Sequence, residues 1–172
     1  MKLVELSTAL QTAFDHFYDD FIQHDVESAE HYAEGHSNFV TYIQRLKEEA
    51  KGINLPDGYV PCSHFWLVNA DNAILGGIRI RHHIGTDFLA LEGGHIGYDI
   101  APSYRGKGYG KLMLKLAIPK VKALGLEKTL LVADDDNMPS RKIIEANGGV
   151  LEDIVMGNVF TNPLARYWLN CQ

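Results

Sequence analysis

The segment that decides the fold is residues 93–124, which read GGHIGYDIAPSYRGKGYGKLMLKLAIPKVKAL. Apolar side chains alternate with small or polar ones over 95–100, and this period of two predicts a strand. Pro102 ends the strand, because proline cannot donate a hydrogen bond to a neighbouring strand. Beyond the glycines, apolar residues over 112–124 follow a helical spacing, and Gly125 is a natural end for that helix. The segment therefore predicts a strand, a glycine-rich turn and a helix.

The turn between that strand and that helix is Arg-Gly-Lys-Gly-Tyr-Gly, residues 105–110. The first amides of a helix have no acceptor within the helix, and the helix dipole makes this end positive. Glycines let the backbone approach a ligand closely and adopt a positive φ. Arg105 and Lys107 add full positive charges. The turn therefore predicts a site for an anion, above all a phosphate.

The spacing of the turn excludes two common phosphate loops. A P-loop requires Ser or Thr after its Gly-Lys pair, whereas Lys111 is followed by Leu112. The dinucleotide fingerprint GxGxxG also fails, because the glycines of the turn are spaced by two. What the segment does contain is Arg-x-x-Gly-x-Gly, at Arg105, Gly108 and Gly110.

This turn, placed directly after a strand that ends in Ile-Ala-Pro, resembles the acyl-CoA pyrophosphate loop of the GNAT acetyltransferase superfamily. A second block, NMPSRKIIEANGG over 137–149, resembles the superfamily's later Asn-x-x-Ser/Ala helix. One predicted strand separates the two blocks, as in the family, and the likeness extends over residues 65–149. It implies an α/β fold with a strongly twisted mixed sheet of about seven strands and helices on both faces. It also implies one acyltransferase domain over 1–172, with N-terminal helices in 7–51 flanking the acceptor cleft.

Periodicity predicts the remaining elements. Helical spacing of apolar residues follows Ser7 and recurs over 37–51, and the polar stretch 25–35 between them is expected to be a loop. Short apolar runs bounded by turn residues predict strands: 2–6, 65–68, 74–82, 88–92, 95–100, 128–133, 150–156 and 164–169. The four strands from 65 to 100 have no helix between them and predict an antiparallel meander. The strand 128–133 follows a crossover helix, so it should lie parallel to 95–100.

Composition narrows the class of protein. The chain has 172 residues and a net charge of −6, which argues against nucleic-acid binding, because that needs a basic face. It has no apolar run long enough to span a membrane and no apolar signal-peptide core, so a cytoplasmic location is expected. Cys62 and Cys171 form neither a metal motif nor a disulfide framework, and no metal site is predicted.

The resemblance implies acetyl-CoA as the co-substrate, with its pantetheine arm between the strands 95–100 and 128–133. The residues that it implies in cofactor binding are Asp99, Ile100, Arg105, Gly106, Lys107, Gly108, Tyr109, Gly110, Asn137 and Ser140. Asn137 is equally suited to cap the helix that follows it.

Several residues are candidates for the base that removes a proton from the acceptor amine. His95 stands where many family members carry Glu, and an imidazole pKa near 6.5 suits proton uptake at neutral pH. A purely structural histidine is the alternative. Glu92 and Asp134 lie near the same strand ends and are further candidates for the base.

Protonation of the departing thiolate is where the sequence departs from the family. Many members carry Tyr at the position aligned with Ile144, and isoleucine cannot donate a proton. Tyr167 is the preferred replacement, with Tyr98, Tyr104 or a water molecule as alternatives.

The resemblance implies an N-acetyltransferase that moves an acetyl group from acetyl-CoA directly to a primary amine. The acidic run 134–136 would suit a cationic amine, although such runs are more often solvated loops. Ile144 supports an alternative, a non-catalytic acyl-CoA sensor or regulatory domain. The acceptor is not identified by the sequence, and a homodimer stays open.

Overall fold

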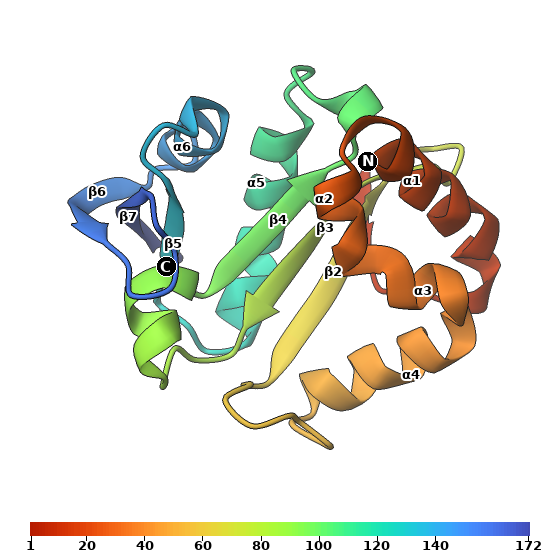
Figure 1. The fold of residues 1–172 in the computed structure, drawn as a ribbon, viewed down its shortest axis with the longest axis horizontal. Coiled ribbons are helices and arrows are strands. Elements are labelled where there is room, and N and C mark those ends of the chain that lie inside the picture. The colour runs from red at the N-terminus through yellow and green to blue at the C-terminus, as the bar shows by residue number, and fades with distance from the viewer.

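The computed structural model describes residues Met1–Gln172, and its centre is one seven-stranded sheet in the order β1-β2-β3-β4-β5-β7-β6 (Figure 1). The strands are β1 (Lys2–Val4), β2 (Cys62–Val68), β3 (Ile74–Arg81), β4 (Ile96–Ile100), β5 (Lys128–Asp134), β6 (Val150–Met156) and β7 (Pro163–Asn170). Neighbouring strands are antiparallel except β4 and β5, which are parallel. The predicted mixed sheet and its parallel central pair are therefore confirmed.

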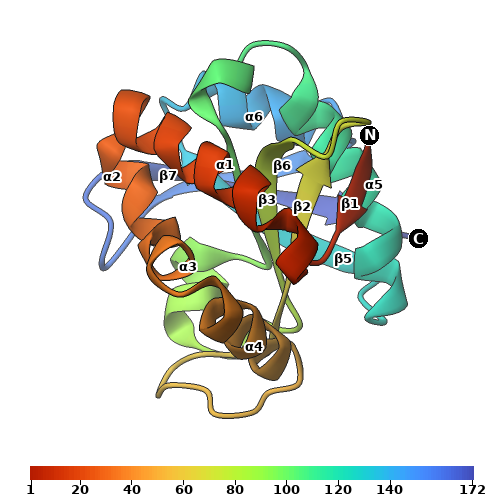
Figure 2. The same ribbon diagram turned by 90° about the vertical axis from the view of Figure 1, so that its right-hand side faces the viewer.

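Helices cover both faces of this sheet, as predicted (Figures 1 and 2). They are α1 (Gln11–His24), α2 (Val26–Ala29), α3 (Ala33–Ser37), α4 (Phe39–Ala50), α5 (Tyr109–Ala123) and α6 (Met138–Glu145). The first four lie on one face, and α5 and α6 lie on the other. No helix is both long enough and apolar enough to cross a membrane.

Each face of the sheet carries its own hydrophobic core. Successive residues of β2 point to opposite faces, so Phe65 and Leu67 pack toward α5, whereas Trp66 and Val68 pack toward the N-terminal helices. The N-terminal core is rich in aromatic rings, which approach one another within 4.8–6.3 Å around Tyr32. Because both faces are covered, most side chains of β2, β3 and β5 are buried and apolar.

The predicted strand 88–92 is wrong. Residues Leu89–Gly93 form a π-helical segment in which Leu89 and Glu92 are buried. The two buried positions are three apart, which is a helical spacing. An apolar run this short is compatible with both a helix and a strand, so the sequence does not distinguish them. Thr86 supports the helical start, because its Oγ1 accepts a hydrogen bond from the Leu89 amide at 3.2 Å.

The predicted loop over 25–35 is also wrong, because this stretch is a series of short helical turns. The Asp25 side chain accepts a hydrogen bond from the Ser28 amide (3.3 Å) and so caps α2. The buried residues are Ala29, Tyr32 and Gly35, again three apart. Gly35 has to be small, because a Cβ atom there would meet the ring of Phe14 at 2.5 Å. Two of the three buried residues are small, so the apolar periodicity of this stretch is weak.

Candidate active site

A slot opens between the two parallel strands at the centre of the sheet. β4 and β5 pair only at Ile96 and Leu131, and the strands diverge beyond that pair. A cleft of about 370 Å³ lies in the gap. Its lining comes from both strands, the start of α6 and the β6–β7 loop, and includes Gly97, Tyr98, Val132, Asp134, Asn137, Ser140, Phe160 and Thr161. The β5-facing edge of residues 97–100 is therefore free to pair with a ligand.

The glycine-rich turn after β4 presents a row of unpaired amides. Gly106 and Gly108 adopt φ angles of 73° and 82°, the left-handed region that favours glycine. The amides of residues 106–111 donate no hydrogen bond to any group of the protein, and Leu112 is the first to find an acceptor, the Gly108 carbonyl at 3.2 Å. Six consecutive free N–H groups at the start of a 15-residue helix are suited to binding an anion.

The charged side chains of the turn are partly engaged within the protein. Arg105 donates from Nε to the Ile100 carbonyl (2.9 Å) and from Nη2 to the Asp25 carboxylate (2.6 Å). The hydrogen bond from Arg105 lowers the pKa of Asp25. Lys107 donates from Nζ to the carbonyl of Ser103 (2.9 Å), and this hydrogen bond holds its Nζ beside the turn. Arg105 therefore links the turn to the N-terminal helices, and the amides of the turn are its donors without a partner in the protein.

The start of α6 reaches the cleft through two of the predicted cofactor residues. Asn137 accepts a hydrogen bond from the Ser140 amide (3.1 Å), so it caps the helix, as the sequence indicated. The Tyr98 hydroxyl lies 2.8 Å from Ser140 Oγ and donates to the Ser140 carbonyl at 3.2 Å. Burial raises the pKa of Tyr98 to about 12, so its phenol is neutral at physiological pH.

The structure places His95 beside the cleft rather than in its lining. The ring is only 5% exposed, and its Nδ1 accepts a hydrogen bond from the Leu130 amide at 2.9 Å. The His95 amide donates in turn to the Leu130 carbonyl (2.7 Å). Burial, with a smaller contribution from the charge of Arg81, lowers the pKa of His95 to about 4. The neutral ring therefore holds β4 against β5, and its acceptor nitrogen is occupied.

Glu92 lines the cleft, but its carboxylate is fully engaged. It accepts hydrogen bonds of 2.7–3.1 Å from the amides of Asn158, Val159 and Phe160 in the β6–β7 loop. Burial acts to raise the pKa of Glu92, but these three amides outweigh it and the pKa is lowered. Gly157 leaves room for the carboxylate, because a Cβ atom there would collide with Oε2. The geometry makes Glu92 an anchor for the loop.

Tyr167 is fully buried and does not line the cleft. Its hydroxyl accepts from Nε of Arg141 and donates to Oε1 of Glu145, both at 2.8 Å. Burial is the main cause that raises the pKa of Tyr167. Ile144, at the position of the family tyrosine, is 1% exposed and belongs to the core. The structure therefore brings Tyr98, and not Tyr167, to the cleft.

Tyr32 and Arg79, which the sequence did not single out, contact Asp99 on the face of the sheet under the N-terminal helices. Asp99 accepts from the Tyr32 hydroxyl (2.8 Å) and pairs with Arg79 (3.0 Å), so its side chain is engaged within the protein, and its backbone lies opposite Gly77 of β3. Arg79 lies over Gly97, where a Cβ atom would come within 3.3 Å of Nη2. Arg79 and Gly97 are paired between β3 and β4, and the sequence alone does not predict this register. Asp134 lines the cleft and makes no side-chain hydrogen bond or ion pair.

Comparison with known proteins agrees with this geometry. The sequence model of the Acetyltransferase (GNAT) family matches residues 20–148, well over half of the chain, and the chain therefore belongs to this family of acetyltransferases. Among curated proteins, no sequence matches it.

Solved acetyltransferase structures share the fold. The ribosomal-protein-S5-alanine acetyltransferase from Vibrio fischeri is similar with a TM-score of 0.69 and 18% identity, covering 99% of this chain and 92% of that one. Mycobacterium smegmatis RimJ, in complex with CoA-disulfide, is similar with a TM-score of 0.70 and 15% identity, and the match covers 98% of this chain and 80% of that one. A mutant spermidine N-acetyltransferase from Vibrio cholerae is similar with a TM-score of 0.61 and 15% identity, and the match covers 99% of this chain and 95% of that one. At these identities the likeness shows the fold alone.

Proposed function

We propose that this protein transfers an acetyl group from acetyl-CoA directly to a primary amine. One observation carries the proposal: the chain that leaves the open slot between β4 and β5 leads directly into six unpaired amides over 106–111. The pyrophosphate would bind these amides, and the pantetheine arm would pair with the free edge of residues 97–100. The RimJ structure with CoA-disulfide shows that a protein of this fold holds a CoA compound.

The whole chain, residues 1–172, acts in this proposal as one acyltransferase domain. The helices α1–α4 flank the acceptor side, because they cover the face on which Asp99 contacts Tyr32 and Arg79. The related structures are named for acceptors that are ribosomal-protein and polyamine amines. A cytoplasmic location is part of the proposal, since acetyl-CoA is made inside the cell.

Asp134 is the carboxylate that we assign to the acceptor amine. Only two carboxylates line the cleft, and Glu92 is saturated by backbone amides. The Asp134 side chain has no partner in the protein, so it is available to bind the N–H groups of the amine and orient its lone pair. Asp134 thereby takes the role that the sequence offered first to His95, whose Nδ1 is already bonded to Leu130.

Tyr98 is the acid that we assign to the leaving thiolate. The amine nitrogen attacks the thioester carbonyl, and a free amide on the edge of β4 stabilises the oxyanion. The tetrahedral intermediate then collapses and the carbon–sulfur bond breaks; the thiolate takes the Tyr98 proton, and the Asp134 carboxylate takes the proton that the nitrogen loses. Ser140, 2.8 Å from the Tyr98 hydroxyl, orients the phenol, and exchange with solvent returns a proton to Tyr98 and removes the one on Asp134.

The test is acetyl-CoA-dependent release of free CoA thiol, measured with polyamines, peptide N-termini, amino acids and aminoglycosides as acceptors. Acetyl-CoA affinity is measured separately by calorimetry. We expect thiol release with at least one acceptor class, and we expect cationic amines to be favoured because of the acidic run at 134–136. Absence of acetyl-CoA binding would contradict the proposal altogether.

A non-catalytic acyl-CoA sensor is the second candidate, and one observation favours it. Ile144 occupies the usual place of the catalytic tyrosine and is sealed in the core, so no side chain at that position reaches a thiolate. The sensor predicts acetyl-CoA binding without thiol release for every acceptor. The enzyme hypothesis predicts turnover that depends on Tyr98. Thiol release and acetyl-CoA affinity, measured together, therefore separate the two candidates.

A further inference from the structure

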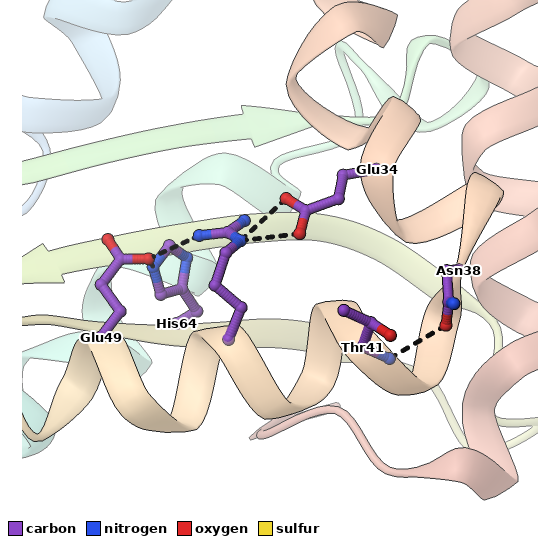
Figure 3. A network of polar contacts seen from close by, with 6 residues as sticks. Glu34, Asn38, Thr41, Glu49 and His64 are labelled. Carbon is purple, nitrogen blue, oxygen red and sulfur yellow. Dashed lines mark hydrogen bonds and ion pairs between the residues drawn. The ribbon is translucent and has the colours of Figure 1, made fainter. Parts of the chain in front are cut away.

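Three side chains of metal-binding type converge outside the cleft, at the contact between α4 and β2. Cys62 and His64 are two residues apart on β2 and project from the same face of the strand. Glu49 approaches them from the last turn of α4. The Cys62 sulfur, a ring nitrogen of His64 and a carboxylate oxygen of Glu49 all lie within 4.8 Å of one another. Figure 3 shows Glu49 and His64 facing each other.

The nitrogen of His64 that faces Glu49 has no hydrogen bond. Nε2 is buried and lies 3.3 Å from Oε2 of Glu49, yet it finds no hydrogen-bond partner. A buried polar atom without a partner is costly and calls for an explanation. Two ligands of one tetrahedral metal ion, bound at 2.0–2.2 Å, are separated by about 3.3 Å. The spacing therefore fits two atoms that share a metal, as well as a direct contact between imidazole and carboxylate.

The chemistry of the group favours zinc. A thiolate and a carboxylate neutralise a divalent cation, and imidazole completes a mixed ligand set that zinc accepts readily. Arg45 donates to Oε2 of Glu49 at 2.9 Å and would orient it as an outer-shell group. Of the three side chains, His64 lines a cavity of about 250 Å³, through which a water molecule can approach the group.

We propose that Glu49, Cys62 and His64 form a zinc site with water as the fourth ligand, which ties α4 to β2. The site is separate from the acetyl-transfer cleft, and the proposal does not depend on that activity. The sequence does not indicate such a site, because Cys-x-His on a strand, with a glutamate thirteen residues upstream on a helix, matches no common zinc spacing.

The test is titration of the full, chelator-stripped chain with Co²⁺, followed by displacement with Zn²⁺. We expect one equivalent of cobalt, with visible bands of a tetrahedral site and a near-ultraviolet sulfur-to-cobalt charge-transfer band. Cys62→Ser should abolish that band and weaken binding by on the order of 100-fold. Cys171→Ser is the matched control, because it removes the other buried free cysteine and should change neither band nor affinity.

A second variant keeps the result decisive if Cys62→Ser does not fold. His64→Gln should weaken cobalt binding while the charge-transfer band from Cys62 persists. The proposal is overturned if the folded chain binds no stoichiometric cobalt or zinc, or if Cys62→Ser and His64→Gln both bind as tightly as the parent. In either case Glu49 and His64 are a carboxylate–imidazole contact beside a buried thiol.

Discussion

The Tyr98 hydroxyl lies 2.8 Å from Ser140 Oγ, so a side chain of β4 reaches across the slot to the first turn of α6. This contact places a neutral phenol in the lining of the cleft. In α6, the position that resembles the family tyrosine is filled by Ile144, which packs into the core. The proton donor of this protein is therefore supplied by the strand in our proposal.

Tyr98→Phe should lower kcat by about 100-fold, the scale of a lost general acid, while acetyl-CoA affinity stays within about twofold. Tyr167→Phe is the matched control, because its hydroxyl is enclosed by Arg141 and Glu145. It should lower stability and leave kcat nearly unchanged. Steady-state kinetics and calorimetry on both variants provide the measurement. A larger fall in kcat for Tyr167→Phe than for Tyr98→Phe would reverse the assignment.

The pH dependence of turnover gives an independent check of the same group. An acid must be protonated to act, and burial raises the pKa of Tyr98 to about 12. Tyr98 should therefore cause no loss of kcat as the pH rises from 7 to 10. A fall in kcat over that range, absent in Tyr98→Phe, would show that the phenol ionises far earlier and would count against its role as the acid.

Gly108→Ala should weaken acetyl-CoA binding by at least tenfold. Gly108 has φ 82°, and an alanine there is strained by about 1 kcal/mol and disturbs the row of free amides. Gly125→Ala is the control, because Gly125 has φ 78° and equally open surroundings but lies at the far end of α5. It should cost similar stability and leave the affinity for acetyl-CoA intact. Equal losses of affinity in the two variants would mean that strain alone acts.

The features that sequence predicted well are those in which the interacting residues are neighbours along the chain. The turn 105–110 joins β4 to α5 as its glycines indicated, and Asn137 caps α6 three residues before its partner Ser140. The parallel pairing of β4 with β5 followed from a crossover rule that holds for almost all such units. Local chemistry and topology were sufficient for these.

The roles of the polar site residues depended on partners far away in the chain. His95 is occupied by Leu130, and Glu92 is occupied by amides from 158–160. No property of either residue in the sequence reveals such a partner, so both remained candidates for the base. Tyr167 appeared available for the same reason, although Arg141 encloses it. The burial of a tyrosine and the occupancy of a carboxylate are tertiary properties.

His95→Gln should change the pH dependence of stability rather than the chemistry. Burial lowers the pKa of His95 to about 4 in the folded chain, below its value near 6.5 when unfolded. The unfolded chain therefore binds more protons between these values, and stability should fall as the pH drops from about 6.5 to about 4. Urea unfolding at several pH values should show a shallower decline for His95→Gln. An unchanged slope would contradict the buried, neutral histidine.

Glu92→Gln should loosen the β6–β7 loop. The pKa of Glu92 is lowered by three loop amides despite its burial, so the carboxylate stabilises the fold above its unfolded pKa, and this stabilisation is lost as the pH falls through the folded pKa. Hydrogen exchange at 158–160 should become at least tenfold faster in Glu92→Gln. Gly157→Ala, which places a Cβ against the carboxylate, should do the same. Exchange at parental rates in both variants would show that the loop is held by other contacts.

Asp134→Asn should reduce kcat/KM for the acceptor by 10- to 100-fold, because an amide cannot bind and orient an ammonium as a carboxylate does. The affinity for acetyl-CoA should be unchanged, since Asp134 lines the cleft and the amides of 106–111 bind the phosphates in our proposal. Asp136→Asn is the matched control: it removes the same charge two residues away, from an exposed side chain. If attraction by the acidic run alone matters, the two variants should lose activity equally, and both losses should shrink as salt is added. If Asp134 orients the amine in the cleft, its variant alone should stay impaired at high salt.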